Sequence, residues 1–336
     1  MPDRPFSSVA ILGTGSFGTA LARLLAPKLD QVVMIGRDPA VAESINAAHH
    51  NSRYLAGIEL PENITATTAL TNAAAHPVIL FCVPTAATRE TASMLAESGL
   101  PADAIVLSCA KGIERNTGER MSEILREKLP SNPVAVLSGP NHAEEIAACL
   151  ATCAVIGTED EVLAKRLQEL FTAPYFRSYT SNDLAGIEYG GAIKNVYAIA
   201  AGIAAGLQLG DNAIAALVTR ALAEMTRLGT CLGGRMETFA GLSGVGDLIA
   251  TCFSKHSRNN RVGRALGQGK TLEEATSSLG MVAEGVPNTL SIHETAQRAG
   301  VRTPIIDAVH AILYRGMPAA RALQELLNRD PRPEKD

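Results

Sequence analysis

Three glycines near the N-terminus constrain the fold of this chain more than any other feature. Gly13, Gly15 and Gly18 follow the G-x-G-x-x-G spacing, directly after the apolar run 8–12 and before a second apolar run at 17–25. The first glycine permits a tight turn, and the second lets a pyrophosphate approach the backbone. The third lets a helix pack closely on the preceding strand. This context predicts a dinucleotide-binding site at the turn.

The next apolar run, 31–35, completes a strand–helix–strand unit and is followed by Gly36, Arg37 and Asp38. NAD-binding chains usually end this strand with an acidic residue that holds the ribose 2′-hydroxyl. Here the acidic residue, Asp38, lies slightly beyond the end of the predicted strand. Arg37 offers a guanidinium that suits a 2′-phosphate and can stack on adenine. We therefore expect NADP to be accepted as well as NAD. The alternative is that Arg37 is a solvated loop charge.

Apolar runs separated by helical stretches continue along the first half of the chain. They lie at 64–66, 78–83, 104–109, 134–137, 153–156 and 175–179. Runs of this kind are typical of an α/β fold with a doubly wound, mostly parallel sheet of the Rossmann type. Ligands bind such sheets at the carboxyl ends of the strands. Lys111, Gly139 and Asn141 all follow predicted strands, and Asn141 stands three residues before Glu144, which predicts a capping box at a helix start.

The pattern then changes, and no further strand is predicted. Ser181–Asp183 offers a helix cap, and a long helical segment follows at about 184–207. Further helices are predicted at 212–228, 259–266, 271–279, 286–299 and 304–314, with a last one ending at 327. We therefore predict two domains, a Rossmann-type dinucleotide-binding domain over 1–181 and an all-helical substrate and catalytic domain over 182–330. The charged segment 331–336 is predicted to be a frayed tail.

Lys194 lies within the long predicted helix among apolar and small residues, about one turn beyond Gly190 and Gly191. Each glycine costs about 1 kcal/mol relative to alanine in a helix interior, which suggests that a ligand or another backbone comes close. A lysine removed from water in a crevice has a lowered pKa and exchanges protons near neutral pH. The alternative is an ordinary surface lysine on an amphipathic helix.

A glycine-rich turn that ends in Asp247 precedes a run of hydrogen-bond donors. These donors are Lys255, Ser257, Arg258, Asn259 and Arg261. Charge-assisted hydrogen bonds are worth roughly 1.5–3 kcal/mol each, and an arginine can make two, so the run predicts a phosphate site. The alternatives are that Asp247 caps a helix and that the basic run is a solvated face. Glu284 either hydrogen-bonds a ribose or caps a turn.

Composition excludes several other classes of protein. The net charge of −4 argues against a nucleic-acid partner. No apolar run of about 20 residues is free of glycine and polar residues, so we expect neither a membrane span nor a signal peptide. The six cysteines form no C-x-x-C pair and no zinc spacing with histidine. We therefore expect no metal site and reduced thiols in a cytoplasmic protein.

Together these motifs resemble those of bacterial-type NAD(P)-dependent glycerol-3-phosphate dehydrogenases. The resemblance is carried by Gly13–Gly18, Val83-Pro84, Ala110–Gly112, Gly139-Pro140, Gly190–Asn195, Gly241–Asp247, His256–Asn259 and Glu284-Gly285, in the family's order. It implies an oxidoreductase that reduces dihydroxyacetone phosphate to sn-glycerol 3-phosphate with NADPH or NADH, and so supplies the backbone of glycerophospholipids. The resemblance is also compatible with a homodimer.

The resemblance further implies roles for single residues. Lys194 would be the proton donor and acceptor, and Lys111 would be a second catalytic residue that orients the substrate. Substrate contacts would come from Lys111, Gly139, Asn141, Asp247, Ser257, Arg258 and Asn259. Cofactor contacts would come from Gly13, Gly15, Ser16, Phe17, Gly18, Arg37, Lys111, Ala143, Arg258, Val282 and Glu284. Asn141 departs from the family pattern, in which serine or threonine is common at this position.

Two other functions stay open on the sequence. A β-hydroxyacid-type dehydrogenase also carries a lysine–asparagine pair on the first helix after its Rossmann domain, but its substrate has a carboxylate in place of the phosphate. A non-catalytic NADPH-sensing protein would bind cofactor but would need neither a desolvated Lys194 nor the donors around Arg258.

Overall fold

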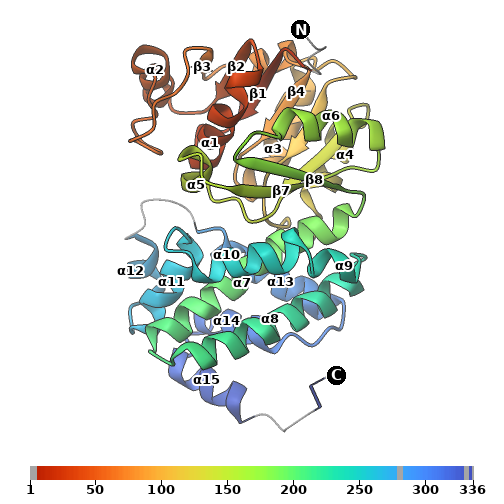
Figure 1. The fold of residues 1–336 in the computed structure, drawn as a ribbon. Coiled ribbons are helices and arrows are strands. Elements are labelled where there is room, and N and C mark those ends of the chain that lie inside the picture. Colours follow the sequence, from red (N-terminus) through yellow and green to blue (C-terminus); the bar gives the residue numbers. More distant parts are fainter. Residues whose placement is uncertain (1–5, 278–282, 329–332, 335–336) are drawn as a thin grey trace.

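The computed structural model describes residues 6–277, 283–328 and 333–334. Eight strands form a single sheet in the order β3-β2-β1-β4-β5-β6-β7-β8 (Figure 1). The strands are β1 (Ser8–Leu12), β2 (Gln31–Ile35), β3 (Ile64–Thr67), β4 (Val78–Phe81), β5 (Ile105–Ser108), β6 (Val134–Ser138), β7 (Thr152–Gly157) and β8 (Phe176–Ser181). Neighbouring strands are parallel except for β6 and β7, which are antiparallel. The predicted mostly parallel sheet is therefore confirmed.

Helices cover both faces of this sheet. The α-helices are α1 (Ser16–Leu25), α2 (Pro39–Ala48), α3 (Thr88–Glu97), α4 (Met121–Lys128), α5 (Ala143–Ala147) and α6 (Glu161–Phe171), with short 3₁₀ turns η1 (Ala26–Lys28), η2 (Leu70–Ala75) and η3 (Thr85–Ala87). Successive residues of β1 enter different cores, because side chains alternate across a strand. Val9 and Ile11 belong to one cluster, whereas Ala10 and Leu12 belong to another.

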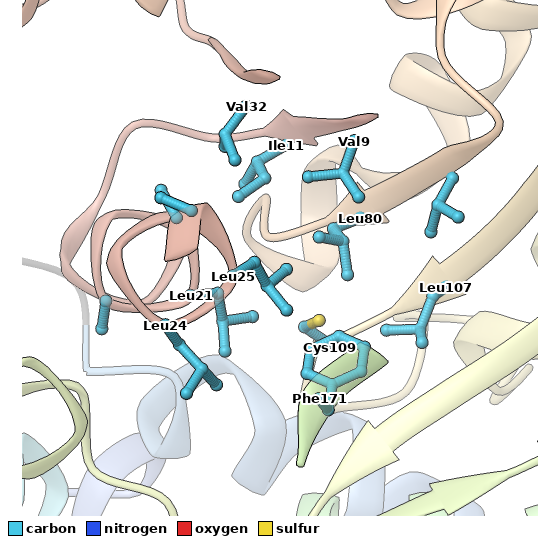
Figure 2. Packing of buried hydrophobic residues seen from close by; sticks show 14 of the residues in the cluster. Val9, Ile11, Leu21, Leu24, Leu25, Val32, Leu80, Leu107, Cys109 and Phe171 are labelled. Carbon is cyan, nitrogen blue, oxygen red and sulfur yellow. The ribbon is translucent and has the colours of Figure 1, made fainter. Parts of the chain in front are cut away.

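Figure 2 shows the first of these clusters, in which leucines of α1 meet side chains of the central strands. Leu21 and Leu25 of α1 are fully buried and lie against apolar residues of β1, β4 and β5, and Phe171 of α6 lies at the same core. This packing holds the N-terminus of α1 at the carboxyl end of β1. The glycine-rich turn is thereby placed at the ligand-binding edge of the sheet.

After β8 the described part of the chain consists of helices joined by turns and loops, with no further strand (Figure 1). It contains α7 (Leu184–Gly206), α8 (Asp211–Cys231), α9 (Met236–Phe239), the π-helical turn η4 (Leu242–Gly246), α10 (Asp247–Phe253), α11 (Arg258–Gly267), α12 (Leu272–Ser277), α13 (Gly285–Arg298), α14 (Pro304–Tyr314) and α15 (Ala319–Leu327). The helix predicted at 271–279 corresponds to α12 within the described residues, and positions 278 and 279 of that prediction lie outside them. The predicted Rossmann-type sheet followed by an all-helical part is confirmed.

Helix α7 is the central element of this helical part, since it is buried along nearly its whole length. It begins after Asp183, whose carboxylate accepts a hydrogen bond from the Gly186 amide at 3.0 Å, as the predicted cap requires. It packs very closely on α11: a Cβ placed on Gly202 would lie 2.2 Å from the Asn260 carbonyl oxygen. The start of α11 is therefore held in a fixed place relative to the buried residues of α7.

The described part of the chain shows neither a helix suited to cross a membrane nor a cluster suited to hold a metal ion. No helix among residues 6–277 and 283–328 is long and apolar enough to cross a membrane. Within the same residues, no group of three or more histidine, cysteine, aspartate or glutamate side chains is arranged to hold a metal ion.

Candidate active site

The glycine-rich turn joins β1 to α1, and each of its glycines has a distinct environment. A Cβ on Gly13 would lie 2.5 Å from the Cys82 carbonyl oxygen, and one on Gly18 would lie 2.1 Å from the Gly13 carbonyl oxygen. Both positions therefore need glycine for close backbone packing. A Cβ on Gly15 would meet nothing within 4 Å, and α1 has no side-chain cap there. The turn thus offers open space beside uncapped helix amides, which fits the pyrophosphate of a dinucleotide.

Residues predicted to contact the cofactor lie around this turn. Ser16 and Phe17 begin α1 and are partly buried, while Arg37 follows β2 and is exposed. Asp38 has other partners: it caps α2 by accepting from the Ala40 amide at 3.0 Å, and it pairs with Arg53 at 3.0 Å. Arg37 is therefore the exposed charge directly after β2, the position at which a ribose is recognised in this fold.

A second group of residues forms a buried charged cluster where the sheet meets α7. Lys194 is only 5% exposed. Its Nζ donates to Asp247 Oδ1 at 2.6 Å and to Thr251 Oγ1 at 2.6 Å. Thr251 lies one turn after Asp247 on α10, so both acceptors face α7 together. The predicted surface alternative for Lys194 is therefore wrong, because this lysine is buried and ion-paired.

Lys111 reaches the same carboxylate from the other side. It follows β5, and its Nζ donates to Asp247 Oδ2 at 2.9 Å, to the Gly139 carbonyl oxygen at 2.8 Å and to Asn141 Oδ1 at 2.7 Å. The predicted capping box at Asn141 is wrong, since α5 begins at Ala143 and has no side-chain cap. Asn141 lies one residue before the N-cap, which is His142, and its oxygen accepts from the lysine ammonium instead. Asp247 therefore bridges two lysines from different parts of the chain.

Burial and these charges set the protonation of the cluster. Burial lowers the pKa of Lys194 to about 8, while Asp247 raises that pKa and Lys111 lowers it. Burial alone would raise the pKa of Asp247, but the two lysines hold it below its ordinary value. Lys194 can therefore both give and take a proton near neutral pH, beside a carboxylate that stays ionised.

A chain of asparagines ties this cluster to the helices behind it. Asn195 Nδ2 donates to the Lys111 carbonyl oxygen at 3.0 Å, and Asn288 Nδ2 donates to the same oxygen at 2.8 Å. Asn259 Nδ2 donates to Asn195 Oδ1 at 2.9 Å, and Asn259 Oδ1 accepts from the Gly285 amide at 2.9 Å. Asn259 thus joins α7, α11 and α13, and its side chain already has partners on both atoms.

The donors predicted to hold a phosphate lie at the start of α11. Ser257 is its N-cap, and its Oγ accepts from the Asn260 amide at 3.2 Å. Arg258 is the exposed first residue of the helix. Glu284 precedes α13. Burial raises the pKa of its carboxyl, whereas the positive charge of Arg258 lowers that pKa. Val282 lies outside the described residues.

Three polar residues of the site were given no role on the sequence alone. Asn195 stands beside Lys194, but only the structure shows that it binds the Lys111 backbone. Thr251 could have been found from its i+4 spacing to Asp247, which places the two side chains on one helix face. Asn288 carries no comparable signal, because its partner Lys111 is 177 residues away in the chain.

Comparisons with known proteins agree over nearly the whole chain. The family model described as NAD-dependent glycerol-3-phosphate dehydrogenase N-terminus matches residues 8–164, and the C-terminus model of that family matches residues 183–324. A curated relative from Moorella thermoacetica is 45% identical over 323 residues, covering 96% of each chain. One from Clostridium tetani is 42% identical over 327 residues, covering 97% of this chain and 93% of its own. Both are named glycerol-3-phosphate dehydrogenase [NAD(P)+].

A solved structure shares the fold as well. The crystal structure of glycerol-3-phosphate dehydrogenase from Coxiella burnetii superimposes with a TM-score of 0.93 at 37% identity. The match covers 97% of this chain and 100% of that one.

Proposed function

Because the chain belongs to the family of NAD-dependent glycerol-3-phosphate dehydrogenases, we propose that it reduces dihydroxyacetone phosphate to sn-glycerol 3-phosphate. The observation that carries this assignment is the buried Lys194–Asp247–Lys111 cluster, whose Lys111 follows β5 at the same carboxyl edge of the sheet as the glycine-rich turn that follows β1. The cluster provides a proton donor at the sheet edge where a nicotinamide cofactor would bind. A sensing protein that only binds NADPH would have no use for such a buried group.

The bound nicotinamide supplies the hydride for reduction and takes it up in the reverse direction. Negative charge then builds on the carbonyl oxygen of the substrate, and the Lys194 ammonium stabilises it and transfers a proton to it. With a pKa of about 8, Lys194 is mostly protonated at neutral pH and regains its proton from solvent after each turnover. Lys111, held by Asp247 and Asn141, orients the substrate.

The substrate phosphate is assigned to Arg258 with Ser257 and the amides at the start of α11. Arg258 is exposed there, and a guanidinium makes paired charge-assisted bonds to phosphate oxygens. Asn259 links this helix start to Asn195, the neighbour of Lys194. Asn195 also donates to the Lys111 carbonyl oxygen, and Lys111 shares Asp247 with Lys194. An anion held at α11 would therefore be linked through Asn259 and Asn195 to the cluster that holds the proton donor. This anion site separates the proposal from a β-hydroxyacid-type dehydrogenase.

The remaining assignments follow the family resemblance. We assign Gly139, Asn141 and Asn259 to the substrate, and Gly13, Gly15, Ser16, Phe17, Gly18, Arg37, Lys111, Ala143, Arg258, Val282 and Glu284 to the cofactor. The chain uses NAD or NADP, and the exposed Arg37 supports binding of the 2′-phosphate of NADP. We also propose a division at residue 181 between the cofactor and substrate domains, a cytoplasmic location and a homodimer.

The test is oxidation of NADPH, and separately of NADH, by the purified protein with dihydroxyacetone phosphate. Unphosphorylated dihydroxyacetone is the control substrate. We expect rapid turnover with the phosphorylated substrate alone. Equal rates with both substrates would refute the anion site, and turnover of hydroxyacids instead would favour the β-hydroxyacid-type reaction.

A further inference from the structure

A buried asparagine outside the cluster described above is bonded directly to the glycine-rich turn. Asn51 lies in the loop between α2 and β3 and is 1% exposed. Its Nδ2 donates to the Thr14 carbonyl oxygen at 2.8 Å and to Thr19 Oγ1 at 2.8 Å, and its Oδ1 accepts from the Tyr54 amide at 3.0 Å. Both amide hydrogens and the oxygen of this side chain are therefore used.

The two acceptors lie on either side of the helix start. Thr14 stands between Gly13 and Gly15 in the turn, whereas Thr19 lies in the first turns of α1. Thr14 is also confined from the other side, because a Cβ on Gly36 would lie 2.4 Å from Thr14 Oγ1. The orientation of the peptide before Gly15 is thus determined by a side chain from a loop distant in sequence.

We propose that Asn51 is a positioning residue for dinucleotide binding. It holds the turn and the N-terminus of α1 in the shape that accepts a pyrophosphate before the cofactor arrives. A glycine-rich turn without this support must lose backbone freedom on binding, and that ordering weakens the affinity. The inference rests on the proposed binding of NADPH or NADH at this turn. It assigns Asn51 no part in proton transfer.

The chain supplies a matched control at the other end of α1. Asn63 Nδ2 donates to the Ala26 carbonyl oxygen at 2.9 Å and to the Leu29 carbonyl oxygen at 2.9 Å. Asn63→Ala therefore removes two hydrogen bonds that an asparagine Nδ2 donates near α1, and it leaves the turn untouched. Asn51→Ala also removes two donated hydrogen bonds, together with the one accepted from the Tyr54 amide. A loss of affinity caused by general destabilisation would occur in both variants.

The experiment measures the dissociation constant of NADPH by fluorescence titration of the wild type, Asn51→Ala, Asn51→Asp and Asn63→Ala. Melting temperature, kcat and the KM for dihydroxyacetone phosphate are measured on the same samples. We expect the dissociation constant to rise about tenfold in Asn51→Ala, as expected for the loss of about one net hydrogen bond. Asn51→Asp should change it in the same direction, because a carboxylate still accepts from Tyr54 but cannot donate to Thr14 when ionised.

In both Asn51 variants, kcat at saturating NADPH and the KM for dihydroxyacetone phosphate should stay within about twofold of the wild type. Asn63→Ala should lower the melting temperature and leave the dissociation constant unchanged. An unchanged dissociation constant in Asn51→Asp, or an equal rise in Asn63→Ala, would overturn the inference. If the wild type binds NADPH but does not reduce dihydroxyacetone phosphate, the proposed reaction is refuted. The dissociation constants would then still test whether Asn51 positions the turn. A wild type that binds neither cofactor would overturn both.

Discussion

Asp247→Asn removes the carboxylate that the two lysines of the cluster share. Lys194 Nζ lies 2.6 Å from Oδ1 and Lys111 Nζ lies 2.9 Å from Oδ2. In the wild type, burial lowers the pKa of Lys194 to about 8 against the opposing effect of Asp247. An adjacent opposite charge moves a pKa by about 1–3 units, so its loss should lower the pKa of Lys194 by about two further units. That shift corresponds to roughly 3 kcal/mol.

The assay is the pH dependence of kcat in both directions. Reduction of dihydroxyacetone phosphate needs the protonated lysine, so its rate falls as pH rises through the pKa of Lys194. Oxidation of glycerol 3-phosphate needs the neutral amine, so its rate rises through the same pKa. Both transitions should lie near pH 8 in the wild type and about two units lower in Asp247→Asn. The variant should therefore lose most reduction at neutral pH.

Thr251→Val is the control for this prediction, because it removes a hydrogen bond to Lys194 without removing a charge. In Thr251→Val, the pH midpoints of the two kcat profiles should fall by less than about one pH unit. Transitions that stay near pH 8 in Asp247→Asn, with circular dichroism showing an intact fold, would refute the claim that Asp247 sets the protonation of Lys194.

Three further changes test other parts of the molecule. Lys194→Ala should lower kcat by about 10²–10⁴-fold without weakening NADPH binding; a near-normal rate would remove Lys194 from proton transfer. Arg258→Ala should raise the KM for dihydroxyacetone phosphate by roughly 10–100-fold. An unchanged KM would contradict the assignment of Arg258 to the substrate phosphate. Glu224 is buried and accepts hydrogen bonds from the Ile305 and Ile306 amides, and burial raises its pKa to about 7. The native state therefore binds more protons than the unfolded state between pH 4.5 and 7, and its free energy of unfolding falls as pH rises through that range. Glu224→Gln should remove roughly 3 kcal/mol of this pH dependence of the free energy of unfolding, measured in urea. An equal pH dependence in the wild type and in Glu224→Gln would refute the raised pKa of Glu224.

Several features of the fold could be read from short stretches of sequence. The turn at Gly13, the buried strands and the cap at Asp183 depend on residues within a few positions of one another. Their spacing is therefore visible in the chain itself. The cap predicted at Asn141 failed because α5 begins at Ala143 with His142 as its N-cap, one residue later than the pattern indicated. The oxygen of Asn141 instead accepts from Lys111, a contact that no local pattern reveals.

The sequence by itself determined the parallel sheet, the glycine-rich turn and the residue types that could move a proton or bind a phosphate. Only the tertiary structure placed Asp247 between Lys194 and Lys111, which lie 53 and 136 residues away from it in the chain. It also placed Asn51 behind a turn 37 residues earlier. The physical reason is that burial and charge at one atom depend on every segment packed around it. Those segments meet only when the apolar faces of the sheet and helices are buried together.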